Sequence, residues 1–151
     1  MRTEGHVYKH ILIATDGSDL AQKAVQQGLE LASHLKAAVT AITVTAPYPV
    51  AETGALMTTI PFQDYQNLVM QHAEEILAPI RDLAGKLGVE CDTVHVPEEH
   101  PAEGIIEQAK TKSCDLIVMA SHGRRGLAKI LLGSQATRVL AYSPVPVLIC
   151  K

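Results

Sequence analysis

Short, continuously apolar runs alternate along this chain with longer segments in which apolar residues recur every three to four positions. The clearest of the short runs are residues 10–15 (HILIAT) and residues 116–120 (LIVMA). A strand that is apolar at every position is covered on both faces, which is typical of a parallel sheet. Parallel strands need crossover connections, usually helices, so the alternation predicts an α/β fold.

The elements are expected in the order β-α-β-α-β-α-β-α-β, which predicts a single open, five-stranded, mostly parallel sheet with helices on both faces. Residues 45–61 contain three prolines and a glycine and are interpreted as a lid or a surface loop. Pro79 lies inside the second helical pattern and predicts a kink or a division of that helix. Strands are expected at residues 10–15, 38–44, 89–96, 116–120 and 145–150, and helices from residues 20, 69, 101 and 134.

Composition narrows the class of protein further. A length of 151 residues fits one domain covering residues 1–151, and 47% hydrophobic against 19% charged residues excludes global disorder. A net charge of −3 gives no reason to expect nucleic acid or an anionic membrane as a partner. No apolar run reaches the roughly 20 residues that span a bilayer, and the first ten residues lack a signal-peptide pattern. The three cysteines, an odd number without a close pair, favour a cytoplasmic location.

The loop after residues 116–120 carries the strongest chemical signal. Open α/β sheets bind ligands beyond the carboxyl ends of their strands, where the strand order reverses, so the loops after strands one, two and four are the places to search. In this loop Gly123 permits a tight turn with outward-facing amides, and Gly133 and Ser134 directly precede a helical pattern. Arg124 and Arg125 add positive charge. Together these residues predict a site for phosphate groups.

The spacing of these residues resembles the universal stress protein family. The chain reads Ala120-x-x-Gly123, then nine residues, then Gly133-Ser134, with Asp16 just after the first strand and the ending PVPVLI at residues 144–149. The resemblance covers essentially the whole chain. It implies a Rossmann-like fold of the adenine nucleotide alpha hydrolase type.

In the nucleotide-binding branch of that family, ATP or AMP binds between the ends of strands one and four. By position, Asp16 would hold the ribose or a phosphate-bound Mg²⁺, Val44 would meet the adenine through its backbone, and Met119 would pack near the adenosine. Gly123 would donate its amide to ribose or phosphate, and residues 133–135 would close on the phosphates. The nucleotide-binding residues that the resemblance implies are Ala14, Thr15, Asp16, Val44, Met119, Ala120, His122, Gly123, Arg124, Gly133, Ser134 and Gln135.

One position departs from the family pattern. Ala120 stands where the first glycine of the motif is expected. If the backbone there has a positive φ or approaches the ligand closely, the methyl group obstructs it, whereas ordinary dihedral angles accommodate alanine. Ala120 also favours an alternative reading of the chain, a ligand-free interaction module of the same fold.

The sequence does not predict a fast enzyme. No Gly-Lys-Ser/Thr follows a strand, and no general base has an evident partner, so at most slow ATP hydrolysis is expected and no residue is assigned as catalytic. His122 is interpreted as a residue that fixes the loop or faces solvent. Asp16 and Ser134 could also serve as helix caps. His95, Glu98, Glu99 and His100 lack the spacing of metal ligands, so no metal is expected from the protein alone.

The last strand bears on assembly. Residues 145–150 are apolar and end the chain, which predicts an edge position in the sheet with unpaired backbone groups. Proteins of the resembled family commonly dimerise by pairing this strand with its twin, so a homodimer is expected. The resemblance further implies a regulator or switch in the response to stress.

Overall fold

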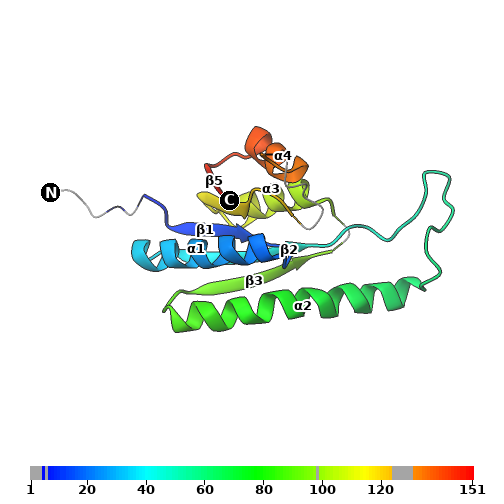
Figure 1. The fold of residues 1–151 in the computed structure, drawn as a ribbon, viewed down its shortest axis with the longest axis horizontal. Coiled ribbons are helices and arrows are strands. Elements are labelled where there is room, and N and C mark those ends of the chain that lie inside the picture. The colour runs from blue at the N-terminus through cyan, green and yellow to red at the C-terminus, as the bar shows by residue number, and fades with distance from the viewer. Residues whose placement is uncertain (1–4, 6, 98, 124–130) are drawn as a thin grey trace.

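The computed structural model describes residues 5, 7–97, 99–123 and 131–151. In these residues four helices alternate with five strands, in the expected order (Figure 1). Their bounds are β1 His10–Ala14, α1 Asp19–Leu35, β2 Ala38–Val44, α2 Phe62–Lys86, β3 Cys91–Val96, α3 Pro101–Thr111, β4 Leu116–Ala120, α4 Ser134–Tyr142 and β5 Val147–Cys150.

The strands form one sheet in the order β3-β2-β1-β4-β5, and every neighbouring pair is parallel. From β1 the chain builds outward through β2 and β3, then crosses back to place β4 on the other side of β1. The predicted α/β sheet is therefore confirmed. The strand order reverses between β1 and β4, which is where an open sheet of this kind binds ligands.

Two apolar layers cover the sheet, and β1 contributes to both. Ile11 and Ile13 pack with α1 and α2, whereas Leu12 and Ala14 pack with α3 and α4. Because both faces of the strand are covered, alternate side chains enter opposite cores and every position from Ile11 to Ala14 is apolar. This is the physical reason for the unbroken apolar run in the sequence.

Helix α2 differs from its prediction in length and continuity. It spans 25 residues and continues through Pro79, so the predicted division there does not occur (Figure 1). Pro79 lies on the exposed side, while Leu77 and Ile80 on either side of it are buried against the sheet. Packing on one face therefore holds the helix together across the missing backbone donor. No helix in the described part of the chain, α2 included, is long and apolar enough to cross a membrane.

The two edge strands start later than predicted. Val89 donates its N–H to the Ala84 carbonyl and so ends α2, which delays β3 to Cys91. Ser143 exchanges hydrogen bonds with the backbone of Val145, and this turn delays β5 to Val147. The edge position predicted for the last strand is confirmed, and β3 forms the other edge of the sheet.

Candidate functional site

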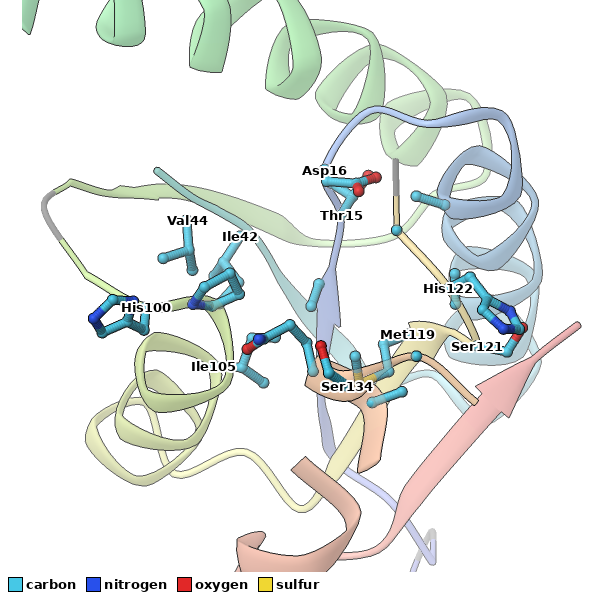
Figure 2. A pocket seen from close by; sticks show the side chains of 18 of the residues that line it. Thr15, Asp16, Ile42, Val44, His100, Ile105, Met119, Ser121, His122 and Ser134 are labelled. Carbon is cyan, nitrogen blue, oxygen red and sulfur yellow. The ribbon is translucent and has the colours of Figure 1, made fainter. Parts of the chain in front are cut away.

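A cavity of about 550 Å³ opens at the carboxyl ends of β1, β2 and β4, where the strand order reverses (Figure 2). The structure brings together around it every implied site residue that it describes, from four separate segments of the chain. These residues are Ala14, Thr15, Asp16, Val44, Met119, Ala120, His122, Gly123, Gly133, Ser134 and Gln135. Arg124 lies outside the described residues.

Part of the wall was missed by the sequence analysis. Ile42 on β2, Ile105 on α3, and His100 and Pro101 at the start of α3 also line the cavity. His100 is exposed, as expected for its loop, but it faces this cavity. Pro101 was a usable signal, because proline at the first helical position marks a helix N-terminus at the ligand-binding edge.

The turn after β1 is built from side-chain hydrogen bonds. Thr15 Oγ1 accepts the Gly17 N–H at 3.1 Å, and Asp16 Oδ1 accepts the Ser18 N–H at 3.0 Å. Ser18 caps α1, since its Oγ accepts the Ala21 N–H at 3.3 Å. Asp16 therefore braces the turn rather than capping the helix.

Glycine fits position 123 because a larger residue would crowd its neighbour, and not because the backbone there needs a positive φ. A Cβ on Gly123 would lie 2.6 Å from Asp16 Oδ2, whereas its φ lies outside the left-handed region. The carboxylate therefore stands directly against the backbone of the loop after β4. Ala120 ends β4, and among the described non-glycine residues only Lys36 and Ser113 have a positive φ. Ordinary dihedral angles at position 120 accommodate the alanine that departs from the family pattern.

The N-terminus of α4 is open toward the cavity. Its cap is Gly133, which offers no side-chain hydrogen bond, and Ser134 is the first helical residue rather than the cap. The Gly133 N–H is already used, since it donates to the Ser121 carbonyl at 2.7 Å. Helix geometry leaves the N–H groups of residues 134–136 without intrahelical acceptors, and these three residues line the cavity. Unpaired donors and the positive end of the helix dipole thus face the same space.

The N-terminus of α3 faces the same cavity but is closed. The Ala102 N–H donates to Gln135 Oε1 at 3.0 Å, and the Gly104 N–H donates to the His100 carbonyl at 2.9 Å. A hydrogen bond from its own backbone N–H, followed by the ion pair with Arg138, lowers the pKa of the Glu103 carboxyl. The Gln135 side chain therefore caps α3, and its carbonyl together with Glu103 makes that end unfavourable for an anion.

The side of the cavity beneath α3 is apolar. Ile42 and Val44 from β2, Ile105 from α3 and Met119 from β4 line it, and Figure 2 shows Val44 and Ile42 on the side of His100, opposite Ser121 and His122. Helix α3 lies close to β2 there, because a Cβ on Gly104 would be only 3.0 Å from Val44 Cγ2. The side chains of β2, α3 and β4 thus form an apolar slot at one side of the cavity, which suits the ring system of a ligand.

Two of the histidines near the strand ends lie within hydrogen-bond distance of a hydroxyl group. His122 Nδ1 lies 3.0 Å from Ser121 Oγ, and its buried Nε2 has no hydrogen-bond partner there. His95 Nε2 lies 2.8 Å from Thr45 Oγ1, and burial lowers the pKa of His95. Glu98 is outside the described residues. Within the described ranges, no three His, Cys, Asp or Glu side chains are grouped so that they could hold a metal ion.

Known proteins similar to this chain in sequence and in fold belong to one family. The model of the universal stress protein family matches residues 7–151. The chain is 35% identical over 151 residues to universal stress protein MJ0531 of Methanocaldococcus jannaschii, covering 100% of this chain and 86% of that protein. Its fold is similar to that of universal stress protein UspA from Lactobacillus plantarum, with a TM-score of 0.78, 23% identity, and coverage of 95% and 98% of the two chains. It is also similar to a universal stress protein solved in complex with cAMP, with a TM-score of 0.68, 25% identity, and coverage of 94% and 95%.

Proposed function

Because the chain belongs to the universal stress protein family, we propose that it binds an adenine nucleotide, ATP or AMP, and acts as a regulator or switch in the stress response. The observation that carries the proposal is that one cavity has an apolar side and a polar side. It is apolar beneath α3 and ends in the open N-terminus of α4 beside Asp16. In this proposal residues 1–151 form one domain that works in the cytoplasm.

The cavity suits a nucleotide in size and in the order of its groups. Its volume of about 550 Å³ lies within the range of roughly 300–1,000 Å³ typical of small-molecule sites. The adenine is placed between Val44, Ile105 and Met119, and the phosphates at the N–H groups of residues 123, 134 and 135. The similar structure that holds cAMP supports an adenine nucleotide as the ligand class.

Asp16 is assigned to the ribose or to a Mg²⁺ ion carried by the phosphates. One carboxylate is enough for the second role, because Mg²⁺ is usually held by one or two carboxylates together with substrate phosphates and water. When bound, the ion would neutralise phosphate charge. Asp16 stays in place either way, since its Oδ1 is held by the Ser18 N–H.

Fast hydrolysis is not part of the proposal. The titratable side chains among the described residues of the cavity wall are Asp16, His100 and His122. His122 is engaged with Ser121, and Figure 2 shows it on the opposite side from His100. A hydrolase needs a base held next to an attacking water, so at most slow turnover is expected.

The experiment that tests the proposal uses the purified full-length chain. The protein is denatured and its supernatant analysed for ATP, ADP and AMP, and nucleotide-free protein is titrated with ATP and AMP by calorimetry. Since the chain contains no Trp and four Tyr, its own absorbance near 260 nm is weak, and bound adenine would dominate the spectrum there. Binding of ATP or AMP, together with much weaker binding of CTP as the matched control, supports the proposal. Absence of ligand in both assays favours the ligand-free module instead.

A homodimer through β5 is the second part of the proposal. The strand lies at the sheet edge and its Leu148 side chain is exposed. An edge strand offers unpaired backbone groups to a second copy. We predict that sedimentation at micromolar concentration gives a dimer and that Leu148→Glu, which places a charge on the exposed edge strand of each copy, gives monomers. A wild-type monomer under these conditions would refute it.

A further inference from the structure

Residues 46–72, called here the arm, stand apart from the rest of the molecule. They comprise the connection after β2 and the first turns of α2. Figure 1 shows both projecting beyond the end of the sheet. The four residues of α2 that are buried, from Ala73 to Ala84, all follow the arm. The first eleven residues of this helix therefore bury no side chain fully in their own domain.

The arm nevertheless carries large apolar side chains at its surface. Seven of them are between 39% and 71% exposed, which is a far denser grouping than the scattered apolar residues that a monomer surface normally shows. These residues are Val50, Leu56, Met57, Ile60, Phe62, Leu68 and Met70.

Internal contacts hold the arm in a defined shape. The ring of Tyr48 packs edge-on against Phe62 and Tyr65, with centroids 5.2 Å apart in both pairs. The Tyr65 hydroxyl donates to the Ala46 carbonyl at 3.0 Å, and Val50 and Leu56 form an antiparallel bridge. The exposed side chains therefore project from an organised scaffold, which lowers the entropy cost of binding a partner.

The charge of this region says what kind of partner fits. Residues 37–80 contain four carboxylates, Glu52, Asp64, Glu74 and Glu75, and neither Lys nor Arg. The chain as a whole carries a net charge of −3, so its negative charge is concentrated in this stretch. Within the arm Glu52 and Asp64 are exposed among the apolar side chains. An anionic membrane or a nucleic acid would be repelled, and a second arm would bring like charges together.

We propose that the arm is a docking surface for a basic amphipathic segment of another protein, in which one apolar face meets the apolar side chains and flanking Lys or Arg residues meet Glu52 and Asp64. An apolar face laid on an apolar surface is an established mode of peptide recognition. Met57 and Met70 suit it, because methionine adapts its shape to different partners. The proposal does not depend on nucleotide binding.

The test uses a defined probe and nucleotide-free full-length protein. A 14-residue peptide with Leu on one helical face and Lys on the other is titrated by fluorescence anisotropy, with a Leu/Glu peptide of the same pattern as its control. The Leu/Lys peptide should bind and the Leu/Glu peptide should not. Leu56→Ser/Met57→Ser and Glu52→Gln/Asp64→Asn should each weaken binding at least tenfold.

Matched variants outside the arm test whether binding depends on the arm itself or only on net charge and exposed apolar surface in general. Val7→Ser/Leu140→Ser removes two exposed apolar side chains elsewhere, and Asp82→Asn/Glu90→Gln removes two exposed carboxylates elsewhere. Both should bind the Leu/Lys peptide within twofold of the wild type. Equal binding by arm and matched variants, or no binding by the wild type, overturns the proposal. A sedimentation change from dimer to monomer in the arm variants alone would show instead that a second copy occupies the arm.

Discussion

The polar and apolar sides of the cavity are built in different ways from the same device, a backbone position without a Cβ. On the polar side, Gly123 leaves room for the Asp16 carboxylate, since a Cβ would lie 2.6 Å from Oδ2. On the apolar side, Gly104 lets α3 approach β2, since a Cβ would lie 3.0 Å from Val44 Cγ2. Gly123 therefore makes space for a charged group, and Gly104 lets a helix pack closely on a strand beside the apolar slot.

The N-termini of α3 and α4 at the cavity also differ between the apolar and the polar side. The N-terminus of α4 has a glycine cap and open donors, whereas that of α3 is closed by Gln135 Oε1. Both helices present the positive end of a dipole to the same space, yet only α4 leaves its donors available. The difference teaches that local capping, rather than the presence of a helix N-terminus, decides where an anion can bind. It predicts one ligand orientation, with phosphates at α4 and the base beneath α3.

The largest expected effect is on the polar side. Gly123→Val should weaken ATP binding by more than tenfold, or more than about 1.4 kcal/mol. The Cβ displaces the Asp16 carboxylate and the branched side chain covers the loop donors. Calorimetry measures the affinity and thermal denaturation checks the fold. A folded Gly123→Val protein with wild-type affinity would contradict the role assigned to this side.

A smaller effect is expected on the apolar side. Gly104→Ala should push Val44 into the slot and weaken ATP and AMP equally, by three- to tenfold, because both ligands carry the same base. Inorganic tripolyphosphate, which has no base, should bind as it does to the wild type. The free energy of unfolding should fall by no more than about 2 kcal/mol, since a gain of about 1 kcal/mol in helix propensity opposes an overpacking cost of about 1–3 kcal/mol. Loss of tripolyphosphate binding would show that the two sides are not separable.

The smallest effect is expected at Ala120, which borders the polar side without a close approach. Ala120→Gly should leave ATP affinity equal or slightly tighter, because the strand backbone is ordinary there. The buried methyl group is lost from the core, so unfolding should become easier by about 1 kcal/mol. Chemical denaturation and calorimetry measure the two quantities on one sample. A several-fold gain in affinity would mean that the methyl group obstructs the ligand after all.

Much of the fold was predictable because its signals are local. Residues 38–44 and 116–120 were placed at their observed bounds, since a strand covered on both faces is apolar throughout. Continuity at Pro79 was not predictable, because it depends on how Leu77 and Ile80 pack against the sheet. The arm was recognised only as a lid or surface loop. Its organisation depends on contacts between Tyr48 and residues that follow the loop, Phe62 and Tyr65.

The residues of the candidate site also divide into those that the sequence predicted and those that it missed. Asp16, Gly123, Gly133 and Ser134 were found from motif spacing, because each lies at a strand end or helix start that the pattern marks. Ile105 and His100 were missed, since Pro101 marks where α3 starts but not which strand end that start lies beside. The role of the Gln135 side chain also escaped prediction, because its partner Ala102 is 33 residues away.

By itself, the amino-acid sequence determined the alternation of strands and helices, the place of the phosphate-type loop and the family, because apolar period, glycine spacing and turn residues act over short stretches of chain. Only the tertiary structure decided which helix end stays open, which side chains stand against the backbone at positions 104 and 123, and where unpartnered apolar surface remains. Those properties depend on the distances in space between segments that lie far apart in the chain. A local sequence pattern carries no information about such distances.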